Sequence, residues 1–186
     1  MKKMILTALV AVASLAANAQ VWVGGEVGFS ADKSTYDGEK YQNSASVKIL
    51  PEIGYTLSDK FDIAVLIGLE HGNSRDLDAE YETNFNSFVL NPYVRYKFVK
   101  SGDFTFFVDG GFGYKYTHWS KVDDNRNSWF IGIKPGIAYN LSEKVSFVAH
   151  VGDLSYSFAK QGKDKYNRFG IGANGNDLTI GAYVSF

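Results

Sequence analysis

Three histidines are the residues of this chain that are best suited to catalysis. His118 stands close to Ser120 and Asp123, and a histidine that holds a hydroxyl and a carboxylate can activate the hydroxyl as a nucleophile. This spacing matches no catalytic motif, and neither do the surroundings of His71 and His150. We therefore predict no catalytic residue and expect that the chain is not an enzyme.

Charged residues at alternate positions offer a second kind of chemistry. They share one face of the predicted strands with glycines and small residues, and we place His150 on the same face. Acids and bases are nearly balanced there, so we expect a structural network of ion pairs rather than a metal or cofactor site. The predicted members are the acids Glu26, Glu52, Asp62, Glu70, Asp109 and Asp177 and the bases Lys48, Arg95, Lys97, Lys115 and Lys134.

Composition narrows the class of protein. The 186 residues include 20 acidic and 19 basic side chains, a balance that does not suit nucleic-acid binding. There is no cysteine, so disulfides and thiolate sites are excluded. After residue 20, no apolar stretch approaches the ~20 residues that a membrane helix needs.

A repeated hairpin pattern predicts the elements that position these charges. Three segments read Pro-x-aliphatic-x-Tyr-x-apolar and are followed by short polar turns: Pro51–Leu57, Pro92–Phe98 and Pro135–Leu141. Alternating polarity, which has the period of a strand, then predicts eight strands. They lie near 20–30, 45–57, 61–71, 86–98, 104–116, 129–141, 145–158 and 177–186. Strand prolines break ladders, so we expect bulges or bends at the three prolines, and a further bulge where the alternation slips at Gly152-Asp153.

The connections and the faces predict a membrane barrel. Short turns at 58–60, 99–103 and 142–144 alternate with long polar segments at 31–44, 72–85, 117–128 and 159–176. The apolar face, with residues such as Ile49, Val65 and Ile133, carries too many large side chains to fill an eight-stranded lumen. We therefore expect it to meet lipid, with Tyr55, Tyr96 and Tyr139 in an interfacial girdle.

The two ends of the sequence predict export and outer-membrane assembly. A basic start, an apolar run and Ala17-Asn-Ala19 predict a signal peptide over residues 1–19, cleaved before Gln20, with a barrel domain over 20–186. The last strand ends in Thr179-x-Gly181-x-x-Val184-x-Phe186. This ending resembles the C-terminal signal that the barrel assembly machinery reads in outer-membrane proteins.

With these residues in place, the chain resembles the small eight-stranded outer-membrane barrels, the class that contains outer membrane protein X and the membrane domain of outer membrane protein A. The resemblance implies an all-β, antiparallel up-and-down barrel in a Gram-negative outer membrane, with three periplasmic turns and four external loops. It also implies contacts with membrane lipid, lipopolysaccharide and the assembly machinery. We expect a monomer with a structural or adhesin-like role through its external loops and an external protein or surface ligand, with a narrow solute channel and a lipid-modifying enzyme as alternatives.

Overall fold

The computed structural model describes residues 21–36, 39–76, 81–120, 122–172 and 178–186. The predicted signal peptide and Asp177 lie outside these ranges. In the part of the chain that is described, no helix is long and apolar enough to span a membrane.

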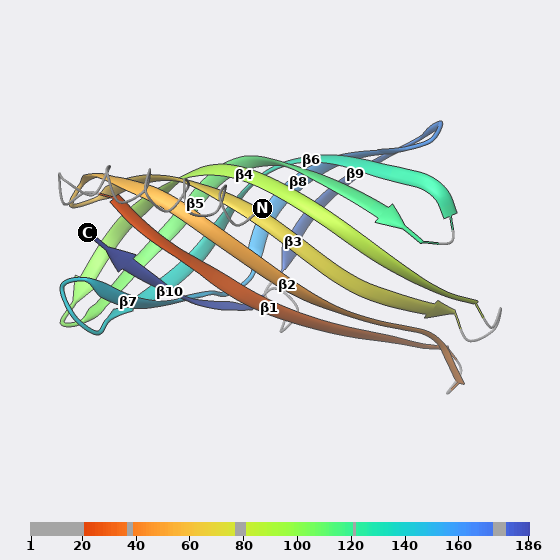
Figure 1. Ribbon diagram of the computed structural model, residues 1–186, viewed down its shortest axis with the longest axis horizontal. Helices are drawn as coiled ribbons and strands as arrows, with labels where there is room; N and C mark the ends of the chain where they lie inside the picture. The colour runs from red at the N-terminus through yellow and green to blue at the C-terminus, as the bar shows by residue number, and fades with distance from the viewer. Residues whose placement is uncertain (1–20, 37–38, 77–80, 121, 173–177) are drawn as a thin grey trace, which may run out of the picture.

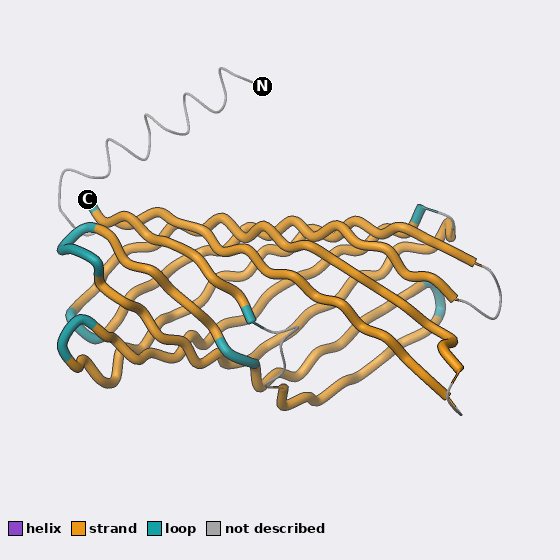
Figure 2. Tube along the Cα trace, turned by 90° about the horizontal axis from the view of Figure 1, so that it is seen from below, coloured by secondary structure: helices purple, strands orange, loops and turns teal. Residues whose placement is uncertain are grey.

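Antiparallel strands form an elongated, twisted barrel (Figures 1 and 2). Each strand from β1 to β6 pairs with the next along the chain, β8 pairs with β6 and β9, and β10 pairs with β7 and β1. The sheet therefore closes into the predicted ring of 8. The ten labelled elements make eight ring positions because β7 and β8 share one, as do β9 and β10. Their bounds are β1 Val21–Tyr36, β2 Glu39–Ser58, β3 Phe61–Asp76, β4 Tyr81–Ser101, β5 Phe104–Trp119, β6 Val122–Asn140, β7 Val145–His150, β8 Asp153–Gln161, β9 Asp164–Gly172 and β10 Thr179–Ser185.

Alternation along each strand produces the expected two faces. Apolar side chains such as Ile49 and Ile133 are exposed on the outer surface, whereas Glu26, Glu52, Asp109 and other polar groups are buried. A soluble protein rarely exposes so large an apolar surface, so this belt is the one that meets lipid.

Aromatic rings border the lipid-facing belt at both ends. Towards the short turns, Tyr96 stacks on Phe61 with ring centres 5.0 Å apart, and Tyr139 lies 5.1 Å from Phe104. Towards the other end, the rings of Tyr114 and Trp129 lie 4.9 Å apart. Such girdles mark the two membrane interfaces of outer-membrane barrels.

The long polar segments do lie together at one end of the barrel, opposite the short turns (Figure 1). Most of their residues, however, continue the strands instead of forming irregular loops. The β3–β4 ladder, for example, runs without a break as far as Asp76 and Tyr81. The predicted strands were too short because a strand beyond the membrane needs no apolar face, so its polar sequence loses the alternation while its backbone stays paired.

The three strand prolines are accommodated in two ways. At Pro51 and Pro92 the register is the same on both sides of the proline, and only the ladder towards the following strand lacks pairs there. Of the two expectations at these positions, the bulge is therefore wrong: a proline without an N–H interrupts the pairing locally and needs no extra residue. At Pro135 the register towards β7 and β8 does shift by one residue.

That shift belongs to the predicted bulge at Gly152-Asp153, which is confirmed. The strand is interrupted at Val151 and Gly152, and Gly152 has a φ of 75° that favours glycine. The Val151 N–H reaches back to the Pro135 carbonyl at 3.2 Å. After this break, Leu154 and Tyr156 continue the outer face beside Ile133 and Ile131.

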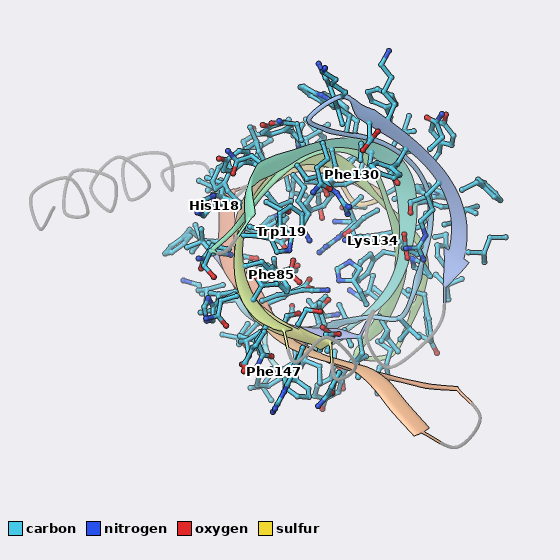
Figure 3. The ribbon with its side chains drawn as sticks, turned by 90° about the vertical axis from the view of Figure 1, so that its right-hand side faces the viewer. Phe85, His118, Trp119, Phe130, Lys134 and Phe147 are labelled. Carbon is cyan, nitrogen blue, oxygen red and sulfur yellow. The ribbon has the colours of Figure 1, made fainter. Side chains whose placement is uncertain are left out.

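Beyond the bulge, towards the hairpin end, described residues of β1 and β9 are neighbours in the ring but do not pair, and we call this gap in the barrel wall the seam. β10 pairs with β1 only from Trp22 to Gly28, and β9 pairs with β8. No described residue of β9 pairs with β1, and the two strands diverge at the hairpin end of the barrel, which faces the viewer in Figure 3. On the outer face of β9, Phe169 and Ile171 are 69% and 77% exposed, beside residues of the lipid-facing belt. The seam therefore begins at membrane depth.

Candidate functional site

The half of the lumen nearest the short turns is filled by a compact core. A buried apolar cluster lines it: Trp22, Leu50, Ala64, Leu66, Tyr93, Phe107, Ala138, Val148 and Tyr183. Glycines on neighbouring strands leave room for its rings. A Cβ on Gly54 would lie 2.2 Å from the Trp22 ring, and one on Gly136 would lie 2.4 Å from the Phe107 ring. The inward-facing residue is thus glycine at these two positions because a large ring from a neighbouring strand covers each of them.

Arg95 stands at the centre of this core. Its Nε and Nη2 donate to the two carboxylate oxygens of Asp109, each at 2.7 Å, in the paired geometry that suits guanidinium and carboxylate. The guanidinium also lies 4.0 Å from the centre of the Phe107 ring. Both charged groups are almost fully buried, so each depends on the other for compensation.

His150 extends the pair into a network across the lumen. Its Nε2 lies 2.8 Å from Asp109 Oδ2, and its Nδ1 lies 2.8 Å from Glu26 Oε1. The Tyr183 hydroxyl lies 2.8 Å from Glu26 and 3.0 Å from Glu52, and Tyr93 donates to Glu52 as well. We call Glu26, Glu52, Tyr93, Arg95, Asp109, His150 and Tyr183, together with the apolar cluster around them, the plug.

The other predicted network residues lie on either side of the plug. Lys97 donates to Asp62 at 2.8 Å on the side of the short turns. On the opposite side, Lys115 donates to Glu70 at 2.5 Å. Lys48 lies beside Glu70 in the β2–β3 ladder, and Lys134 forms no ion pair with any described residue.

Sequence reasoning missed the aromatic members of the plug. Trp22 and Tyr183 lie on the same strand faces as Glu26 and Gly181, so their parity alone points inward. Their aromatic side chains hide this inward orientation, because the sequence predicts large apolar rings on the lipid-facing side. The hydroxyls of Tyr93 and Tyr183 explain why tyrosines occupy these inward positions, since each hydroxyl donates to a buried carboxylate.

The predicted C-terminal signal forms the strand that closes the ring. Thr179 and Gly181 face the lumen, where Thr179 donates to Glu26, and a Cβ on Gly181 would lie 2.2 Å from the Gly25 carbonyl. Val184 and Phe186 are exposed on the outer face. The Phe186 N–H donates to the Val21 carbonyl at 3.0 Å. The segment therefore has a structural role in the finished barrel, whatever role it has in assembly.

The histidines do not form an arrangement typical of hydrolases. His71 Nδ1 lies 2.8 Å from Asn86 Oδ1, and His118 Nδ1 lies 2.8 Å from Asn125 Oδ1. His150 contacts two carboxylates inside the plug. None of these contacts involves a hydroxyl that a histidine could activate. In the residues that the structure describes, no group of histidines and acids is suited to hold a metal ion.

A closed antiparallel barrel with a lipid-facing belt, aromatic girdles and a polar plug defines the class of outer-membrane β-barrel proteins. Residues 4–176 match the outer membrane protein beta-barrel domain family, and the chain belongs to it. Its place is therefore the outer membrane of a Gram-negative bacterium. In barrels of this class, short turns lie on the periplasmic side and long connections lie outside the cell.

Solved structures with the same fold support the assignment. Neisserial surface protein A aligns with a TM-score of 0.52 and 17% identity, covering 89% of this chain and 97% of that one. The outer membrane protein OprG from Pseudomonas aeruginosa aligns with a TM-score of 0.57 and 14% identity, covering 89% and 94%. At these identities the likeness concerns the fold alone. No curated protein matches the chain significantly in sequence.

Proposed function

We propose that this protein is a monomeric, non-conducting barrel that acts as a surface-interaction protein through its external hairpins. The observation that carries the proposal is the plug: it fills the periplasmic half of the lumen, while the strands continue beyond the lipid belt. A narrow solute channel, the first alternative, requires a path that the plug obstructs. A lipid-modifying enzyme, the second, requires a histidine on a hydroxyl, and the histidine contacts described above supply none.

The external hairpins present a partner with paired strands rather than irregular loops. Ladder pairs hold β3 and β4 together to their ends, and polar contacts tie these strands to the next hairpin. The Ser120 N–H donates to the Asn84 carbonyl at 2.9 Å, and the Ser120 hydroxyl accepts from the Asn84 N–H at 3.2 Å. A preformed surface loses little conformational entropy on binding. Exposed Lys160, Lys163 and Lys165 on the β8–β9 hairpin are suited to lipopolysaccharide phosphates.

Adhesion of whole cells tests the proposed surface role. We expect that cells of a non-adherent strain displaying the protein are retained on an epithelial monolayer several-fold more than the parent strain. Substituting Arg75 and Glu82, an exposed cross-strand pair of the β3–β4 hairpin, with serine should reduce that retention. Substituting Asp59 and Lys60 in a periplasmic turn is the matched control and should change nothing. Retention equal to that of the parent, with the protein present at the surface, would contradict an adhesive role.

We further propose that export requires the signal peptide over residues 1–19 and that Phe186 is read by the assembly machinery. Because Phe186 is partly exposed and its side chain faces lipid, its loss should cost the folded barrel little. Deleting Phe186 is therefore expected to reduce outer-membrane levels several-fold in cells, with little change in the stability of protein refolded in detergent. Quantitative blotting of outer-membrane fractions measures the first effect and a denaturant titration the second. Normal accumulation of the deletion variant would refute the signal.

A further inference from the structure

Above the plug, the lumen widens into a cavity of about 710 Å³, which we call the outer vestibule. Looking into the barrel from the hairpin end, Figure 3 shows Phe85, Trp119, Phe130 and Lys134 directed into it. Glu26, Glu52, Asp109 and His150 of the plug line its floor, where His150 contacts Glu26 and Asp109. A volume of this size holds a small organic molecule, and the floor makes the vestibule a cup rather than a passage.

Basic groups outnumber acids on the walls of the vestibule. Five basic side chains line it above the floor, Lys48, Lys115, Arg126, Lys134 and Arg168, against the acids Glu70 and Asp153. Glu70 already accepts from Lys115. Lys134 and Arg168 are exposed to the cavity and pair with no acid among the described residues. Away from the acidic floor, this local surplus of positive charge on the walls favours an anion, because the low-dielectric wall strengthens the attraction.

Aromatic rings give the same cavity an apolar side. The Arg126 guanidinium lies 5.3 Å from the Trp119 ring centre and 5.4 Å from that of Tyr166. Gln161 holds it in place, accepting from Arg126 at 2.9 and 3.1 Å. Fixed cations beside aromatic surfaces match a ligand that has a charged group attached to a flat or apolar body.

We propose that the outer vestibule is a binding site for a small anion, a phosphate or carboxylate that carries an aromatic or apolar group. Lys134 and Arg168 supply charge for the anionic group, and Trp119 and Tyr166 supply surface for the apolar part. The proposal goes beyond the surface role of the hairpins and does not rest on it. Two sources of the anion fit the same chemistry: a solute that enters from outside, and a lipid headgroup that reaches the vestibule through the seam between β1 and β9.

Calorimetric titration of phenyl phosphate tests the site, with the full barrel in phosphatidylcholine nanodiscs. We expect saturable binding that Lys134→Gln and Arg168→Gln each weaken about tenfold, which corresponds to loss of one charge-assisted contact of ~1.4 kcal/mol. Lys60→Gln removes the same charge from a periplasmic turn and should leave the affinity unchanged. Benzylammonium, which has a similar ring and carries the opposite charge at neutral pH, should not bind.

Two further measurements make the result decisive. The thermal transition of each variant in the same nanodiscs shows that the barrel is intact, and because neither side chain has an acidic partner among the described residues, we expect no shift. Replacing phosphatidylcholine by phosphatidylglycerol identifies the source: a weakened apparent affinity for phenyl phosphate indicates a competing headgroup, and an unchanged affinity indicates a soluble anion. Absence of saturable binding, or equal affinity in both vestibule variants and the wild type, would overturn the proposal.

Discussion

Replacing Arg95 with alanine is expected to lower the free energy of unfolding by ~3–5 kcal/mol, the cost of leaving a buried charge without its partner. Asp109 would lose both of its 2.7 Å contacts with the guanidinium, and Phe107 would lose the cation above its ring. Any water that enters the lumen would reduce the loss. A urea titration of the refolded barrel in lipid vesicles measures the change.

Two matched variants separate this effect from a general effect of removing arginine. Arg75→Ala removes an exposed arginine from the external hairpin and should be nearly silent, because exposed charges contribute little. Arg95→Lys keeps the charge but cannot make both contacts with Asp109, so its stability should lie between those of the wild type and Arg95→Ala. If Arg95→Ala were as stable as Arg75→Ala, the plug would not be the stabilising element that its geometry indicates.

Introducing arginine at Ile49 or Ile133 is expected to destabilise the barrel by ~2–4 kcal/mol if the site lies near the middle of the membrane. Both side chains stand on the outer face, where Ile49 is 57% exposed, and in the membrane this exposure is to hydrocarbon. An arginine there must reach towards an interface or draw water into the lipid.

Asn73→Arg is the matched control for the lipid face. Asn73 is exposed and lies on the outward side of β3, beyond the last apolar position at Leu69, between Ala45 and Asn84 in the ladders. The new charge would stand in water and should change the stability by less than ~1 kcal/mol. Equal losses for Ile49→Arg and Asn73→Arg in the same vesicle titration would show that the lipid-facing belt has been misplaced.

Much of the fold could be predicted from the sequence because the period of a strand is short and local. Ile49, Glu52 and Ile53 alternate between lipid and lumen within a few residues, so the two faces follow from the spacing alone. The hairpin ends were harder to predict. Asn73 and Ser74 remain in register with β2 and β4 although nothing in their residue types separates strand from loop.

The plug could be predicted only in part, because some of its contacts join strands that are not neighbours in the sheet. Arg95 and Asp109 are opposite one another in a single hairpin, so their contact follows from the register of β4 and β5. His150 and Glu26 stand on strands separated by β10, and their contact depends on how far side chains reach across the closed lumen. Closure brings such groups together, and no local pattern in the sequence records it.

Single-channel recording of the purified protein in a planar lipid bilayer tests whether the plug closes the lumen. We expect silence from the wild type across the usual range of voltages. We expect brief, flickering currents from Arg95→Ala, because loss of the guanidinium leaves Asp109 with His150 as its remaining partner and admits water to the periplasmic half of the lumen. Large, stable and frequent openings of the wild-type protein would show that the plug leaves the lumen open and would identify the barrel as a channel.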